Sequence, residues 1–208
     1  RIKICGITRV EDAVSAVSSG ADAVGLIFYG PSPRAVSLQR AVEIVGNLPA
    51  LVHVVGVFVD PNVKEVEAVL SRVRPSLLQF HGSEPAEFCN RFGIPFIKSL
   101  RMSDDADPEK YAQSYPQARA LLLDTYDTQR YGGTGSTFSW ERGMQCQSSP
   151  VIIAGGIDEC NVSAAVSDSG AYAVDVSSGV EASPGHKSAE KIQSFICAVR
   201  AHDQIHGD

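Results

Sequence analysis

The chain has 208 residues, of which 44% are hydrophobic, and a formal net charge of −6 at pH 7. This length suits a single domain with a full hydrophobic core, and the negative charge argues against nucleic acid as a partner. No apolar run approaches the ~18 residues of a membrane span, and the first residues are not signal-like, so we expect no membrane partner. Because the chain begins at Arg1 rather than at a methionine, we expect it to be a trimmed segment.

The five cysteines are widely spaced and include no C-x-x-C pair. An odd count at such spacing argues against a disulfide framework and against a zinc site. We therefore expect a reducing compartment, the cytoplasm.

Eight short apolar runs recur along the chain. Near-continuous apolar runs are typical of parallel strands that are buried on both faces. The predicted strands cover residues 2–5, 21–28, 52–58, 77–80, 96–98, 121–124, 151–154 and 171–176.

Helical patterns lie between these runs. Residues 63–73, for example, carry apolar side chains at the i, i+3, i+7 spacing of an amphipathic helix. Thr8 and Glu11 have the spacing of a capping box, and Asp60 precedes Pro61 as a helix cap would.

The alternation of strands and helices predicts a single (β/α)8 barrel, a TIM barrel, over residues 1–208. A doubly wound open sheet is the alternative architecture. The count of eight strands and the lack of a G-x-G-x-x-G motif after the first strand favour the barrel. A long glycine-rich connection over residues 125–139 is expected to act as a lid.

Two strand ends carry residues suited to proton transfer. The carboxyl ends of barrel strands converge on one face, where sites lie. Cys5 ends the first predicted strand, and a thiolate there, favoured by a nearby helix start, could act as a base. Asp124 ends a very apolar strand, where burial favours a protonated carboxyl that could act as a general acid. The alternatives are a packed thiol and a structural aspartate that caps the next loop.

Loops at the same face have the composition of anion sites. Glycine and serine let backbone amides and hydroxyls approach an anion, and barrels frequently bind phosphate after strands seven and eight beside a short helix turn. Residues 180–185 have room for that turn. An arginine in a proline-stiffened loop can grip a carboxylate. Tight turns and a solvated arginine are the alternatives. The candidate binding residues are Arg34, Gly155, Gly156, Ser177, Ser178 and Gly179.

Three further polar residues lie at or near strand ends. We expect Gln79, His81 and Asp175 to support the reacting groups rather than to react. No set of histidines and acids has the spacing of metal ligands. We therefore expect no bound metal.

The motifs together resemble those of the phosphoribosylanthranilate isomerase family. The resemblance runs from Lys3 to about Lys191. In chain order the motifs are KICGIT at 3–8, SPR at 32–34, QFHG at 79–82, LD at 123–124, GGTGSTFSW at 132–140, AGGI at 154–157 and DVSSGVE at 175–181.

The resemblance implies an Amadori rearrangement of N-(5-phosphoribosyl)anthranilate in tryptophan biosynthesis, without cofactor or metal. It implies Cys5 as general base and Asp124 as general acid. It also implies that Arg34 holds the anthranilate carboxylate and that the glycine and serine loops hold the phosphate. Either a monomer or a homodimer is compatible with it. The chain departs from the family pattern at Ala35, usually aromatic, and at Ser188, usually an acid.

Two other functions are compatible with parts of the sequence. The histidine-pathway isomerase barrels are similar but carry an aspartate at the Cys5 position, and a metal-dependent epimerase would need histidines and acids at several strand ends. A phosphate-binding barrel that has lost catalysis is the other alternative. The presence of both Cys5 and Asp124 argues against it.

Overall fold

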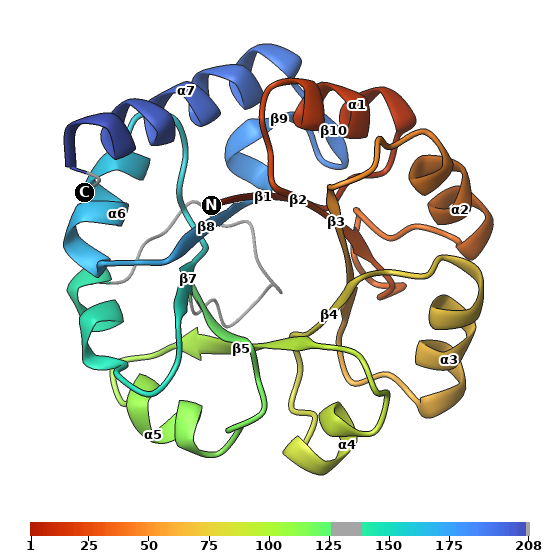
Figure 1. Ribbon diagram of the computed structural model, residues 1–208, viewed down its shortest axis with the longest axis horizontal. Helices are drawn as coiled ribbons and strands as arrows, with labels where there is room; N and C mark the ends of the chain where they lie inside the picture. Colours follow the sequence, from red (N-terminus) through yellow and green to blue (C-terminus); the bar gives the residue numbers. More distant parts are fainter. Residues whose placement is uncertain (126–138, 207–208) are drawn as a thin grey trace.

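The computed structural model describes residues 1–125 and 139–206. Within them, eight parallel strands close into a barrel in the order β1 to β8, and helices form a ring around it (Figure 1). The predicted (β/α)8 architecture is thus confirmed. The strands are β1 (Ile2–Cys5), β2 (Ala23–Ile27), β3 (His53–Phe58), β4 (Leu77–Phe80), β5 (Phe96–Met102), β6 (Ala120–Thr125), β7 (Val151–Ile153) and β8 (Ala173–Val176).

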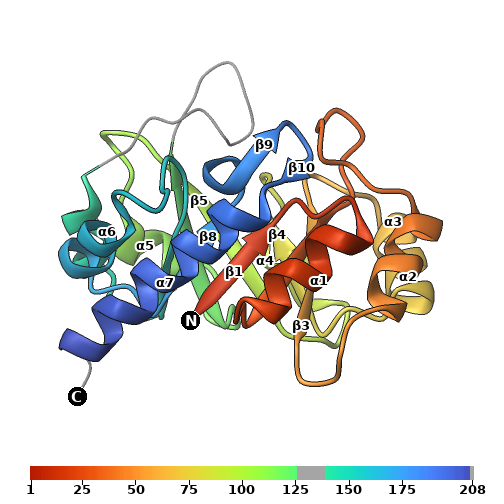
Figure 2. The ribbon, with the colours of Figure 1, turned by 90° about the horizontal axis from the view of Figure 1, so that it is seen from above.

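The outer elements follow the strands. The helices are α1 (Val10–Ser18), α2 (Leu38–Gly46), α3 (Val63–Arg72), α4 (Ala86–Asn90), α5 (Pro108–Gln113), α6 (Val162–Ser169) and α7 (Ala189–His206), with 3-10 helices η1 (Trp140–Gln145) and η2 (Ser178–Val180). A hairpin of β9 (Glu181–Ser183) and β10 (His186–Lys187) lies at the end of the barrel opposite the N-terminus (Figure 2). None of the helices in the described ranges combines the length and apolar character that crossing a membrane requires.

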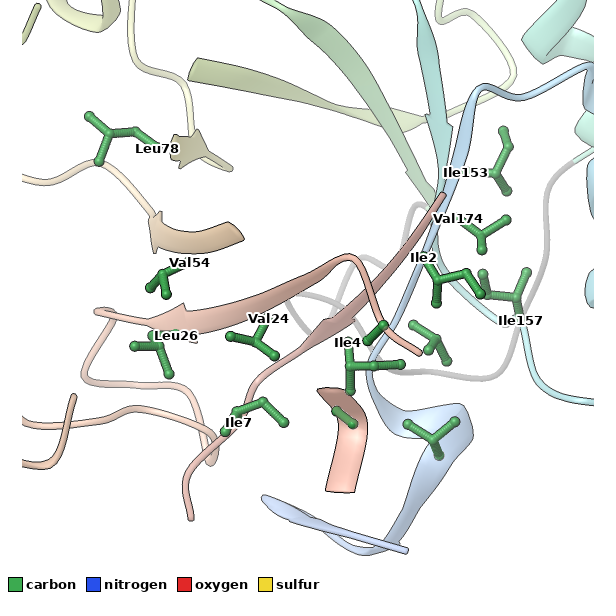
Figure 3. Close-up of a cluster of buried hydrophobic side chains, with 14 of the residues drawn as sticks. Ile2, Ile4, Ile7, Val24, Leu26, Val54, Leu78, Ile153, Ile157 and Val174 are labelled. Atoms are coloured by element: carbon green, nitrogen blue, oxygen red, sulfur yellow. The ribbon is translucent and has the colours of Figure 1, made fainter. Parts of the chain in front are cut away.

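Strand alternation divides the apolar residues between two layers. Side chains such as Ile2, Ile4, Val24 and Leu26 are fully or almost fully buried in the larger cluster (Figure 3). The alternate positions face the barrel interior, where Cys5 packs with valines of β3. Because β1 alternates in this way, Lys3 and Cys5 share the inward face.

Two predicted helix caps are wrong. The N-cap of α1 is Arg9, and its side chain makes no capping hydrogen bond. The Thr8 hydroxyl instead donates to the carbonyl of Gly185, which ties the start of the chain to the β9–β10 hairpin. The cap of α3 is Asn62, which forms a capping box with Glu65.

Asp60, the residue predicted to cap that helix, lies in a turn with φ of +46°. Its carboxylate accepts a hydrogen bond from the backbone N–H of Ser83 at 2.6 Å, so it joins the loops after β3 and β4. Strand β5 also runs beyond its predicted end at Lys98. Its pairing with β6 continues through Arg101 and Met102 even though polar residues interrupt the apolar run.

A buried ion pair supports the loop that carries His81. The Lys98 ammonium group lies 3.0 Å from Glu84 Oε2 and donates to the carbonyls of Phe80 and Gly82 at 3.2 and 2.6 Å. These two carbonyls flank His81. The side chains of Lys98 and Glu84 are 0% and 2% exposed. The pair therefore fixes the backbone on both sides of a residue in the candidate site.

We expect Lys98→Met to lower the free energy of unfolding by about 3–5 kcal/mol, because it leaves the Glu84 carboxylate buried without its cation. Urea unfolding followed by circular dichroism measures the change. Lys64→Met, at an exposed position of α3, is the control and should stay within about 0.5 kcal/mol of the parent. Equal effects of the two substitutions would contradict a structural role for the pair.

Candidate active site

A pocket opens where the barrel strands end, and it brings together almost all of the residues predicted for the site. Cys5 reaches it from β1, and Asp124 reaches it from β6. Of the predicted residues, Gly179 does not line the pocket. Glycine is nevertheless required at this position, because a side chain would collide with the carbonyl of Ile157. The predicted residues that line the pocket are Cys5, Arg34, Gln79, His81, Asp124, Gly155, Gly156, Asp175, Ser177 and Ser178.

Both carboxylate oxygens of Asp124 make polar contacts. Oδ1 accepts a hydrogen bond from the backbone N–H of Thr125 at 2.9 Å, and Oδ2 lies 3.1 Å from His81 Nε2. The side chains of His81 and Asp124 are 14% and 7% exposed. Gln79 extends the chain of contacts, since its Nε2 lies 3.1 Å from His81 Nδ1. His81 therefore touches the candidate acid directly, inside the pocket.

The orientation of the Gln79 amide is linked to the proton between His81 and Asp124. As placed, Gln79 Nε2 donates to His81 Nδ1, so a neutral ring carries its proton on Nε2 and donates to an ionised Asp124. Gln79 Oε1 is buried and has no hydrogen-bond partner among the described residues. In the opposite orientation of the amide, Gln79 Oε1 would accept a hydrogen bond from His81 Nδ1–H. His81 Nε2 would then carry no proton and could accept a hydrogen bond from a protonated Asp124. The two orientations thus correspond to an ionised and a protonated Asp124 carboxyl.

The loop after β7 requires glycine next to Asp124. Gly155 and Gly156 have φ of +77° and +67°, in the left-handed region that glycine adopts without strain. A Cβ atom at Gly155 would collide with Thr125 and with the Asp124 carboxylate. The loop therefore passes directly over the candidate acid.

Cys5 is 7% exposed, and its environment differs from the predicted one. Burial raises the pKa of the Cys5 thiol, and the charge of Lys3 opposes this shift only in part. Helix α1 begins at Val10, close to the predicted start, and its effect on the thiolate stays a prediction. The side chains that bring positive charge near the thiol are Lys3, Lys187 and Arg34.

Lys3 forms a buried ion pair with Asp175. Lys3 Nζ lies 2.8 Å from Asp175 Oδ2, and the two side chains are 6% and 7% exposed. Burial raises the pKa of Asp175, and Lys3 opposes that rise. Burial alone would lower the pKa of Lys3, but Asp175 and Cys5 outweigh it and the pKa is raised. The lysine therefore keeps its charge inside the barrel.

A second ion cluster joins Arg34 to the β9–β10 hairpin. Arg34 Nε and Nη2 each donate to Glu181 at 2.7 Å. Lys187 Nζ lies 3.0 Å from Glu181 Oε1 and donates to the carbonyl of Ser177 at 2.9 Å. Burial alone would raise the pKa of Glu181, but Arg34 and Lys187 outweigh it and the pKa is lowered. The cluster orients Arg34 and leaves its Nη1 without a hydrogen bond to the described residues.

Some features of the site were not predicted. A helix turn was predicted within residues 180–185, and this position is wrong. The short helix η2 ends at Val180, and β9 occupies 181–183. The ionic roles of Lys3, Glu181 and Lys187 were missed, although Lys3 shares the inward face of β1 with Cys5. The predicted lid lies outside the described residues except at its ends, Thr125 and Ser139.

A thiol and a carboxyl share one pocket with glycine and serine loops at the carboxyl face of a (β/α)8 barrel, which is where barrel enzymes carry their active sites. Residues 2–198 match the family model described as N-(5'phosphoribosyl)anthranilate (PRA) isomerase. The chain therefore belongs to the PRA isomerase family, and it is an isomerase of the aldose–ketose type.

Individual relatives agree with the family model. The N-(5'-phosphoribosyl)anthranilate isomerase of Alcanivorax borkumensis is 50% identical over 207 residues, which cover 96% of this chain and 95% of that protein. The crystal structure of phosphoribosyl anthranilate isomerase from Thermotoga maritima superposes with a TM-score of 0.88 at 38% identity, over 97% of this chain and 98% of the other. A structure of phosphoribosyl anthranilate isomerase in complex with reduced 1-(o-carboxyphenylamino)-1-deoxyribulose 5-phosphate has a TM-score of 0.83 at 37% identity, over the same shares of the two chains.

Proposed function

We propose that the chain, acting as one barrel domain over residues 1–208, catalyses the Amadori rearrangement of N-(5-phosphoribosyl)anthranilate. The product is 1-(2-carboxyphenylamino)-1-deoxyribulose 5-phosphate. The observation that carries this proposal is that Cys5 and Asp124 line one pocket together with the glycine and serine loops. The rearrangement of this substrate requires a base and an acid for the proton transfers, and an anion site that binds its phosphate.

Asp124 is the proposed general acid. In its protonated state it donates to the furanose ring oxygen, and the ring opens to an iminium. The contact with His81 Nε2 supports this role, because the imidazole nitrogen can either donate a hydrogen bond to the ionised carboxylate or accept one from the protonated carboxyl. Thr125 N–H and the close approach of Gly155 fix the carboxyl in the pocket.

Cys5 is the proposed general base. The iminium makes the C2 hydrogen acidic, and the thiolate removes it as a proton to give an enolamine, which tautomerises to the ketone. The thiol proton must first leave to solvent, because burial raises the pKa of Cys5. Each proton transfer contributes about 10²- to 10⁴-fold to the rate.

The remaining residues hold the two ends of the substrate. The phosphate is bound by Gly155, Gly156, Ser177, Ser178 and Gly179, whose backbone amides and hydroxyls suit an anion. Arg34 binds the anthranilate carboxylate. Because Nε and Nη2 already donate to Glu181, Nη1 is the proposed donor to that carboxylate. Holding both ends orients the reacting carbon between acid and base.

The cellular setting follows from the same reasoning. The five cysteines are all free thiols, which suits the reducing cytoplasm. The small-molecule substrate is the proposed partner, and the protein works as a monomer or as a homodimer. Sedimentation at assay concentration distinguishes the two assemblies.

A coupled fluorescence assay tests the proposed function. Phosphoribosylanthranilate is formed in the cuvette, and its anthranilate-type fluorescence decays when the enzyme rearranges it. We expect a decay proportional to enzyme concentration and faster than the spontaneous loss of substrate. No acceleration, together with turnover of a histidine-pathway aminoaldose phosphate, would favour the rival isomerase activity instead.

A further inference from the structure

Lys3 and Cys5 lie side by side in the barrel interior. They are two residues apart on β1, and Cys5 pairs in register with Gly25 of β2. A Cβ atom at Gly25 would lie 2.8 Å from Cys5 Sγ and 3.2 Å from Lys3 Cε. The absence of a side chain at Gly25 therefore makes the space that the thiol and the lysine stem share.

Asp175 holds the ammonium group of this lysine from the other side. Lys3 pairs in register with Asp175 of β8, and their charged atoms are 2.8 Å apart. Asp175 Oδ1 is buried and has no hydrogen-bond partner in the described part of the chain. Lys3 is thus the cation that balances Asp175, and it is also the cation beside the thiol.

The other charges near the thiol are committed elsewhere. Lys187 and Arg34 both bind Glu181. Asp124 and His81 interact electrostatically with Asp175 and contact each other. The groups that face Cys5, from β1, β8, β10 and the loop after β2, are Lys3, Asp175, Lys187 and Arg34.

We infer that Lys3 is a positioning residue of the reaction, because its single buried ammonium group is shared between the Cys5 thiol and the Asp175 carboxylate. Lys3 favours release of the thiol proton to solvent, whereas the carboxylate charge of Asp175 opposes it. The two acids therefore compete for one cation, and the state of Asp175 sets how readily the thiolate forms. This inference rests on the proposed role of Cys5 as the base.

The competition predicts opposite effects of two substitutions on the same thiol. Lys3→Met removes the cation, and we expect the pH midpoint of thiolate formation to rise by about one pH unit or more. Asp175→Asn frees the cation, and we expect the midpoint to fall by a similar amount. A purely structural role for the pair would move both midpoints in the same direction or move neither.

Alkylation of Cys5 by iodoacetamide at a series of pH values measures the midpoint, because only the thiolate reacts. Mass spectrometry of the Cys5 peptide follows the folded parent and each variant. The peptide of exposed Cys197 is the internal control and should keep one profile throughout. Shifts in the same direction, or none, would overturn the inference.

A third variant keeps the test decisive if Lys3→Met fails to fold. The double variant Lys3→Met/Asp175→Asn leaves no unpaired buried charge, and its midpoint is compared with that of Asp175→Asn alone. We expect the double variant to have the higher midpoint, and an equal or lower one would contradict the sharing of Lys3.

Activity provides an independent readout. If Cys5 is the base, the limb of the kcat profile that rises with pH should move with the alkylation midpoint in each variant. A midpoint that shifts while this limb stays fixed would refute the role of Cys5 as base and leave the sharing of Lys3 intact.

Discussion

Asp124→Asn should abolish measurable turnover, a loss of about 10⁴-fold in kcat, the upper end of what one proton transfer contributes. The amide keeps the size of the carboxyl and can still accept the hydrogen bond from Thr125 N–H. It cannot supply an acidic proton to the ring oxygen. Binding should therefore change little, and only the chemical step should fail.

Calorimetric titration with reduced 1-(o-carboxyphenylamino)-1-deoxyribulose 5-phosphate separates binding from chemistry in this variant. We expect its Kd to stay within about threefold of the parent value, a difference of under 1 kcal/mol. Asp168→Asn, exposed on α6, is the matched control and should keep full activity. A parallel loss of binding and rate would mean that Asp124 is structural.

Cys5→Ser is expected to lower kcat by about 10²- to 10⁴-fold, because a hydroxyl does not ionise in the range where a thiol does. The substitution is nearly isosteric at a buried position, so the fold should be retained. The loss is measured in the coupled fluorescence assay at saturating substrate.

The control for this variant is Cys197→Ser, which removes an exposed thiol on α7. It should leave the rate unchanged. Full activity of Cys5→Ser would exclude the thiolate as base, and the C2 proton would then need another acceptor in the pocket. Asp175 would be the first group to test, because it lines the same pocket and its Oδ1 has no hydrogen-bond partner within residues 1–125 and 139–206.

The barrel could be predicted from the sequence because its signals are local. Each strand is a short apolar run, and the closing order follows from consecutive right-handed βαβ units. The convergence of Cys5 and Asp124 follows from the architecture, since strand ends meet at one face. The end of β5 was underestimated because Ser99 and Arg101 are polar, whereas pairing with β6 decides where the strand stops.

The electrostatics of the site could not be predicted in the same way. Whether a thiol is activated depends on burial and on charges brought from other strands, and neither is visible in a linear motif. Lys3 is a neighbour of Cys5 in the chain, but Asp175 reaches it only through the closure of β1 against β8. The pairing of Arg34 with Glu181 likewise needs the hairpin, which has no strong local signal.

The central claim is that Cys5 and Asp124 act on one substrate from the two sides of its ribose. A crystal structure with reduced 1-(o-carboxyphenylamino)-1-deoxyribulose 5-phosphate tests it most directly. We expect Cys5 Sγ in contact with C2 of the sugar, and the Asp124 carboxyl within about 2.6–3.2 Å of the oxygen that corresponds to the ring oxygen. A ligand bound with either group turned away from these atoms would contradict the account.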